Sequence, residues 1–199
     1  MNDNNNDFLY NFDMRLFVGA LGIVIIIVIV FLFQRSSLNQ DEVATNNMSD
    51  FSLNSPEFKT SGFIPKRFTC DGENISPRLE IKNVPADAKS LVLIMDDPDA
   101  TGGVIWDHWL LWNIEPETQF IHEDDVPLGA FQGTTSFGEM RYGGPCPPKG
   151  SKPHRYMFKL YALDGRLTLS RGATKSQIEK AMEGHILGQT VFMGLYERK

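Results

Sequence analysis

The sequence predicts a mostly β domain, a β-sandwich with one helical addition, that follows a single transmembrane helix. Three observations carry this prediction. Short apolar runs alternate with turn residues from about residue 51 onward, one capped amphipathic segment occurs late in the chain, and residues 16–33 are uncharged throughout. With 199 residues and 42% hydrophobic side chains, the chain is long enough for one ordinary domain and an appendage.

Four runs have the composition of strands. Each is short, rich in aliphatic or aromatic residues and bounded by polar or turn-forming residues. The third run ends at the dipeptide Asp164-Gly165, which is typical of tight turns. The predicted strands are Ser90–Met95, His108–Ile114, Arg155–Leu163 and Thr190–Glu197.

One helix is predicted between about residues 174 and 184. Thr174 and Gln177 have the spacing of a capping box, and Gly184 is placed to end the helix. An apolar stripe that can pack against a sheet is formed by Ile178, Ala181 and Met182.

The apolar stretch 16–33 predicts a membrane anchor. As a helix it would span roughly 27 Å, close to the ~30 Å hydrocarbon layer. A cleaved signal peptide is the alternative, but the leader 1–15 is acidic rather than basic, and Gln34 and Arg35 follow where a cleavage site should lie. We therefore expect an uncleaved single-pass anchor, followed by a polar flexible linker over 34–51.

Charge and cysteine content narrow the class of protein. The formal net charge is -6, but residues 1–51 hold six acidic and two basic side chains, so the remainder is close to neutral. A near-neutral domain gives no electrostatic reason to expect nucleic acid as a partner. No CxxC motif occurs, which argues against structural zinc.

The two cysteines, Cys70 and Cys146, leave two readings open. They could form one disulfide in an oxidising compartment or remain two buried thiols. One arginine flanks each end of the apolar stretch, so the positive-inside rule gives no orientation. A disulfide would place the domain outside the cytoplasm, and that extracytoplasmic location is our expectation.

Three segments carry the side chains that suggest chemistry. Asp97–Ala100 (Asp-Pro-Asp-Ala) directly follows a buried strand, where carboxylates need partners or a ligand. Trp106–Trp109 places an imidazole between two indoles, and Tyr142–Pro148 is a stiff loop rich in Gly and Pro. If the third strand begins as early as His154, then His154 and Tyr156 point to one face and the arginine between them to the other. Taken singly, each segment is more often a turn or a core element than a site.

Together and in this order, the segments resemble the phosphatidylethanolamine-binding protein family, also called the Raf kinase inhibitor proteins. The resemblance covers about residues 52–199. It rests on Asp-Pro-Asp-Ala, on His-Trp with Asn113 beyond it, on Tyr-Gly-Gly-Pro-Cys-Pro-Pro and on His-Arg-Tyr. The form of the Cys-Asp-Gly-Glu-Asn-Ile-Ser-Pro segment at 70–77 is similar to the bacterial and archaeal branch.

The resemblance implies a sandwich of two antiparallel sheets and a small pocket that accepts phosphate-like groups. By position, the implied ligand-binding residues are Asp97, His108, His154, Tyr156, Tyr142, Gly144 and Pro145, with Asp99 and Trp106 in support. Thr101 departs from the family, in which a proline is common at this position.

The resemblance implies a non-catalytic binding protein without cofactor or metal, and the apolar stretch 16–33 adds the expectation that it is tethered to a membrane. Its ligand would be a phosphate-bearing small molecule or a phospholipid headgroup, and it could regulate a kinase or protease partner. The alternative is a metal- or acid-base-dependent enzyme that uses the Asp/His/His cluster. If both imidazoles donate to an anion, binding should strengthen below about pH 6.5.

Overall fold

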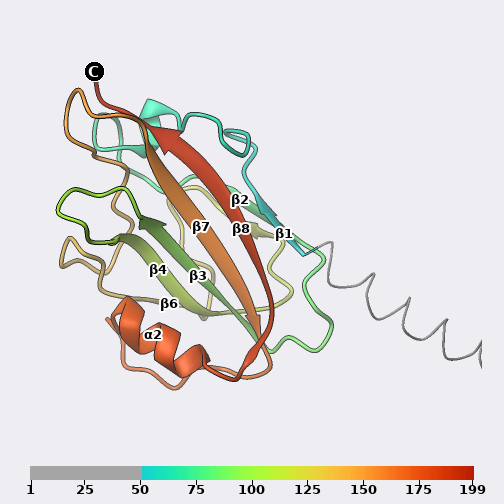
Figure 1. Ribbon diagram of the computed structural model, residues 1–199. Helices are drawn as coiled ribbons and strands as arrows, with labels where there is room; N and C mark the ends of the chain where they lie inside the picture. The colour runs from blue at the N-terminus through green and yellow to red at the C-terminus, as the bar shows by residue number, and fades with distance from the viewer. Residues whose placement is uncertain (1–50) are drawn as a thin grey trace, which may run out of the picture. The chain divides into compact units, whose positions relative to one another are not determined.

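The computed structural model describes residues 51–199, so the predicted leader, anchor and linker through residue 50 lie outside the described part. Within residues 51–199, no helix has the length and apolar character needed to cross a bilayer. This part folds mostly into β-strands, with one α-helix and a short 3-10 helix (η1, Lys66–Phe68) (Figure 1). The strands are β1 (Ser52–Asn54), β2 (Leu79–Lys82), β3 (Ser90–Asp97), β4 (Trp106–Ile114), β5 (Phe120–Ile121), β6 (Phe131–Gln132), β7 (His154–Leu163) and β8 (Ile186–Tyr196).

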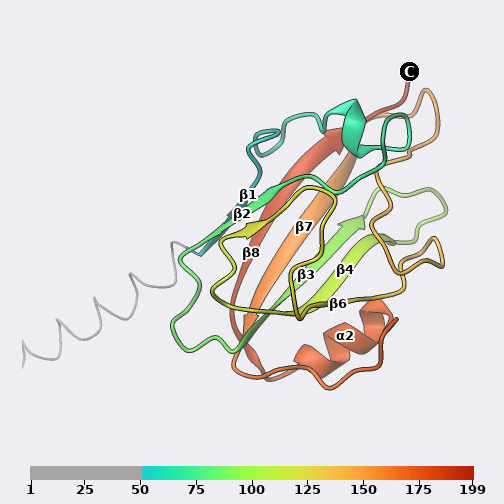
Figure 2. The same cartoon turned by 180° about the vertical axis from the view of Figure 1, so that it is seen from behind.

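The strands form two antiparallel sheets packed as a sandwich, as expected for the fold class. The larger sheet has the order β6-β4-β3-β7-β8 and the smaller one the order β1-β2-β5. Seen from behind, β1 and β2 pass in front of the larger sheet (Figure 2). The main core lies between the sheets, because apolar side chains of both sheets belong to one buried cluster.

Alternation along β3 explains how one strand serves two layers. Leu91, Leu93 and Met95 belong to the core between the sheets, whereas Val92 and Ile94 belong to a second cluster on the outer face. All eight residues of β3 are buried, which is why this strand reads as a continuous apolar run rather than an alternating one.

The predicted helix is α2 (Lys175–Met182), and its capping box is present. The backbone N–H of Thr174 donates to Oε1 of Gln177 at 2.9 Å. Ile178 and Met182 are buried in the cluster on the outer face of the larger sheet. The helix therefore covers the face of the sheet that the small sheet does not cover (Figure 1).

The four predicted strands are confirmed as β3, β4, β7 and β8, with shifted ends. β4 begins at Trp106 rather than His108, and β8 begins at Ile186 rather than Thr190. The first difference matters for function, because residues 106 and 107 extend β4 to the end of the sheet where β3 finishes.

Candidate functional site

The candidate site lies at the end of the larger sheet where β3 finishes and β4 and β7 begin (Figure 1). A pocket of about 300 Å³ opens there. Three neighbouring antiparallel strands thus bring side chains from three distant segments to one place. The side chains that the following argument uses are Asp97, Trp106, His108, Phe137, His154 and Tyr156, and all six line the pocket.

The two adjacent carboxylates at the end of β3 point to opposite faces of the sheet. On the outer face, Asp96 is fully buried and accepts from Nζ of Lys159 at 2.7 Å and from Nζ of Lys175 at 2.5 Å. Asp97 lies on the inner face and lines the pocket. The strand period therefore assigns one carboxylate to a structural ion pair and the other to the site.

A β-bulge directs His108 into the pocket. Met95 pairs with Trp109, but the next residue of β3, Asp96, pairs with Asp107, so His108 is an extra residue in β4. In a regular strand His108 would share a face with Leu110, which packs on the outer face of the sheet. The bulge instead lets it line the pocket.

His154 is held by the carboxylate of Asp97. Nδ1 of His154 donates to Oδ2 of Asp97 at 2.8 Å, and both side chains are almost completely buried. The other carboxylate oxygen, Oδ1, accepts from the backbone N–H of Asp99 at 2.8 Å. Each oxygen of Asp97 thus already has a partner, so its main effect is to orient the imidazole, whose Nε2 is left for a ligand.

His108 is held in a similar way by the backbone of the Gly-rich loop. Its Nδ1 donates to the carbonyl oxygen of Gly143 at 2.6 Å, and the N–H of Gly143 donates back to the carbonyl oxygen of His108 at 2.9 Å. Burial lowers the pKa of His108, and the nearby Gly143 carbonyl and Asp97 oppose that effect only in part. The sequence predicted that His108 would donate to an anion as a charged imidazolium. The lowered pKa instead favours the neutral ring.

Tyr156 contributes a buried hydroxyl group. Its ring lies edge-on to that of His108, with centroids 5.2 Å apart. Burial raises the pKa of the phenol, and the negative charge of Asp97 adds to the effect, so the hydroxyl stays protonated. The hydroxyl oxygen has no hydrogen-bond partner of normal geometry among residues 51–199, although the backbone of Cys146 lies close to it. Its proton is therefore not committed to a protein acceptor of normal geometry and is available to a ligand that reaches it.

Asp99 is bonded to Arg155, whose side chain lies on the face opposite to those of His154 and Tyr156. Its Oδ2 accepts from the backbone N–H of Arg155 at 2.9 Å and from Nε at 2.8 Å, and its Oδ1 accepts from Nη2 at 2.7 Å. These bonds fix the turn after β3 to the start of β7. The hydrogen bond with the Arg155 side chain lowers the pKa of Asp99 to about 2.

We expect this pair to contribute to stability only above strongly acidic pH. A carboxyl group with a lowered folded-state pKa stabilises the protein fully above its unfolded value, here 3.8, and loses that contribution as the pH falls toward about 2. Denaturant unfolding at pH 4.5 and at pH 2.5 should therefore show a smaller difference in stability for Asp99→Asn than for the wild type. Equal differences would contradict the structural role of the pair.

The loop Tyr142–Pro145 does not form the lining that the resemblance implied. The hydroxyl of Tyr142 donates to the carbonyl oxygen of Phe68 at 2.8 Å, and the N–H of Gly144 donates to Oδ1 of Asn74 at 2.8 Å. The carbonyl oxygen of Pro145 accepts from the N–H of Cys70 at 3.1 Å. We correct the predicted ligand contacts of Tyr142, Gly144 and Pro145, because their polar groups are bonded within the protein. The loop acts on the pocket by holding His108.

The two cysteines form a disulfide, which resolves the alternative that the sequence left open. Cys70 and Cys146 are bonded, with their Cα atoms 5.4 Å apart. Cys146 also lines the pocket, next to two prolines. The disulfide therefore fastens the wall of the pocket to the segment that follows η1.

Phe137 lines the pocket, although nothing in the sequence marks it as part of a site. Phe137 packs edge-on against Trp106 and His108, at centroid distances of 5.5 and 5.4 Å, yet 43% of it is exposed. No periodicity marks this loop position as part of a site. Thr101, where the family commonly has proline, also lines the pocket.

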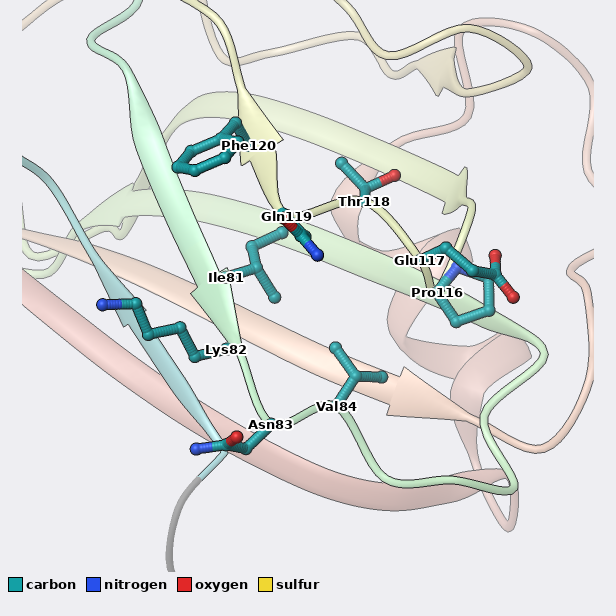
Figure 3. A pocket seen from close by; sticks show the side chains of 9 residues that line it. All are labelled: Ile81, Lys82, Asn83, Val84, Pro116, Glu117, Thr118, Gln119 and Phe120. Carbon is teal, nitrogen blue, oxygen red and sulfur yellow. The ribbon is translucent and has the colours of Figure 1, made fainter.

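A second hollow, of about 360 Å³, lies between the end of β2 and the segment before β5 (Figure 3). Its charged side chains are Lys82 and Glu117, and its lining contains no histidine or cysteine. Across residues 51–199, no three His, Cys, Asp or Glu side chains converge as metal ligands would. The pocket at Asp97, with one carboxylate and two imidazoles, therefore has more ionisable groups that can bind an ionic ligand than this second hollow has.

Comparison with known proteins agrees with this fold. A family model described as phosphatidylethanolamine-binding protein matches residues 54–197. A UPF0098 protein of Methanothermobacter thermautotrophicus is 49% identical over 152 residues, which cover 74% of this chain and 99% of the relative. A UPF0098 protein of Pyrococcus horikoshii is 46% identical over 148 residues, covering 71% of this chain and 74% of the relative.

Solved structures show the same fold at appreciable sequence identity. A phosphatidylethanolamine-binding protein homologue of Chlamydia trachomatis superposes with a TM-score of 0.70 at 42% identity, covering 74% of this chain and 97% of the other. YbcL of E. coli, described as a member of the mammalian PEBP family, superposes with a TM-score of 0.72 at 31% identity, covering 76% and 100%. Both alignments span most of the other chain, so the likeness extends over a whole domain.

Proposed function

The chain belongs to the phosphatidylethanolamine-binding protein family, and from that premise we propose that its pocket binds a phosphate-bearing small ligand without catalysing a reaction. The observation that supports this most is the convergence of Asp97, His108, His154 and Tyr156 on one pocket of about 300 Å³. A hollow of this size is at the small end of ligand sites and suits a headgroup rather than a whole lipid.

The pocket offers both donors and acceptors to such a ligand. The Tyr156 hydroxyl is a donor, and the bond from Nδ1 of His154 to Asp97 leaves Nε2 of that ring for a ligand. The neutral ring of His108 offers a lone pair. A phosphate group, which has several acceptor oxygens and at most a few protons, can use both kinds of partner.

Replacing His154 by alanine should weaken phosphate binding. The variant loses one charge-assisted hydrogen bond, which corresponds to about 1.5–3 kcal/mol, or roughly ten- to a hundredfold in the dissociation constant. Isothermal titration of the full-length chain with O-phosphoethanolamine would measure the change.

His185→Ala is the matched control for this titration. His185 is exposed and paired with Asp164 at 2.8 Å, and it is absent from the lining of the pocket. The control should bind as the wild type does. Undiminished binding by His154→Ala would remove the proposed role of the pocket.

We extend the proposal to the setting of the domain. The apolar stretch 16–33 would tether the domain to a membrane, and the Cys70–Cys146 disulfide favours an oxidising, extracytoplasmic compartment. In that setting, ligand binding could control the association of the domain with a kinase or protease partner. Thiol trapping in intact cells tests the compartment, because a disulfide kept outside the cytoplasm leaves neither cysteine free to react.

A further inference from the structure

The hydrogen bonds around His108 fix which ring nitrogen carries the proton. A carbonyl oxygen has no hydrogen to give, so Nδ1, at 2.6 Å from the Gly143 carbonyl, must be the donor. The loop cannot easily turn away, because the N–H of Gly143 bonds back to His108 and the N–H of Gly144 bonds to Asn74. In the neutral ring, Nε2 is therefore an acceptor only.

The surroundings of His108 favour this neutral state. The ring is 3% exposed and faces Asp97 of β3, Tyr156 of β7 and the apolar ring of Phe137. The charges of Asp107 and Asp96 have smaller electrostatic effects on the ring than the charge of Asp97. Burial has the largest effect and lowers its pKa, while the three carboxylates raise it by smaller amounts.

We propose that Nε2 of His108 accepts a hydrogen bond from the P–OH group of a singly protonated phosphate monoester, and so makes the pocket selective for that class of ligand. This inference rests on the proposed function and names the substrate class of the same site. A phosphate monoester has a second pKa of about 6, so its monoanion carries one proton at mildly acidic pH.

Two ligand classes of similar size lack this proton. A sulfate monoester is fully ionised, and a phosphodiester, such as the headgroup of a phospholipid, has no P–OH group. Either would direct oxygen lone pairs at the lone pair of Nε2, in a site where an unpaired polar group is costly. The same pocket would still offer them the Tyr156 hydroxyl as a donor, so they are weaker ligands rather than excluded ones.

Methyl phosphate, methyl sulfate and dimethyl phosphate test the selectivity, because they share a methyl ester and lack an ammonium group. Titrations of the full-length chain at pH 6 should give at least tenfold tighter binding for methyl phosphate than for the other two. At pH 8 this preference should shrink, because methyl phosphate is then almost entirely the dianion.

The pH dependence separates this mechanism from simple charge attraction. If the greater charge of the dianion caused the preference, the affinity ratio of methyl phosphate to methyl sulfate would grow from pH 6 to pH 8. A growing ratio, or equal affinities at pH 6, would overturn the inference and leave the proposed function standing. Failure of all three compounds to bind would overturn both.

Two variants test whether the preference for methyl phosphate arises at His108. His108→Ala should bring the ratio at pH 6 close to one, whereas His154→Ala should weaken all three ligands and keep the ratio. If the affinity ratio at pH 6 in His108→Ala stayed as high as in the wild type, His108 would not be the source of the selectivity. The wild-type ratio at two pH values gives the test on its own should His108→Ala fold poorly.

Discussion

Replacing Cys70 and Cys146 together by alanine should lower the free energy of unfolding by about 4 kcal/mol. The disulfide joins residues 76 positions apart, and closing so long a loop removes much of the conformational entropy of the unfolded chain. Denaturant unfolding monitored by tryptophan fluorescence would measure the loss.

Reduction of the wild-type protein provides the control for this result. A dithiol reductant should lower wild-type stability by a similar amount and leave the double alanine variant unchanged. A variant within about 1 kcal/mol of the oxidised wild type would show that the disulfide contributes little beyond the contacts already present. Loss of the disulfide should also weaken ligand binding, because Cys146 forms part of the pocket wall.

Replacing Asp97 by alanine should abolish most of the ligand binding and also destabilise the domain. The substitution leaves Nδ1 of the buried His154 and the partly buried backbone N–H of Asp99 without their acceptor. Each unsatisfied group costs about 1–3 kcal/mol. Binding of O-phosphoethanolamine should weaken at least tenfold, because His154 is no longer oriented and loses the negative charge beside it.

Two further variants separate charge from structure at this position. Asp97→Asn keeps an acceptor oxygen and the size of the side chain, so it should be more stable than Asp97→Ala but still bind weakly. Asp87→Asn, in an exposed turn, should match the wild type in both stability and affinity. If Asp97→Asn bound as well as the wild type, the charge of Asp97 would have no role in recognition.

The sequence predicted those elements whose patterns are long enough to be specific. β3, β7 and α2 follow from an uninterrupted apolar run, a run rich in aromatic and aliphatic residues that ends at Asp164-Gly165, and a capping box. The individual strands of the small sheet were not predicted. A strand as short as β5, which has two residues, is too short to show the alternation of apolar and polar residues that identifies a strand. These strands are fixed by packing onto the larger sheet rather than by their own sequence.

The candidate site likewise has parts that the sequence predicts and parts that depend on contacts between distant residues. The common face of His154 and Tyr156 follows from strand geometry, and both residues line the pocket. The bulge that directs His108 inward is one extra residue, and nothing local in the sequence marks it. The Gly-rich loop was assigned to the ligand by resemblance, but whether its amides face a ligand or its own neighbours depends on distant contacts such as that of Gly144 with Asn74.

The histidine side chains allow the most direct test of the central claim that this pocket binds a phosphate-bearing ligand. The chain has four histidines: His108 and His154 line the pocket, whereas His122 and His185 are exposed and absent from its lining. In imidazole ¹H–¹⁵N spectra recorded during titration with O-phosphoethanolamine, we predict that the signals of His108 and His154 shift together with one dissociation constant while the other two stay in place. Unmoved signals for the first pair, or equal shifts for all four, would contradict the account.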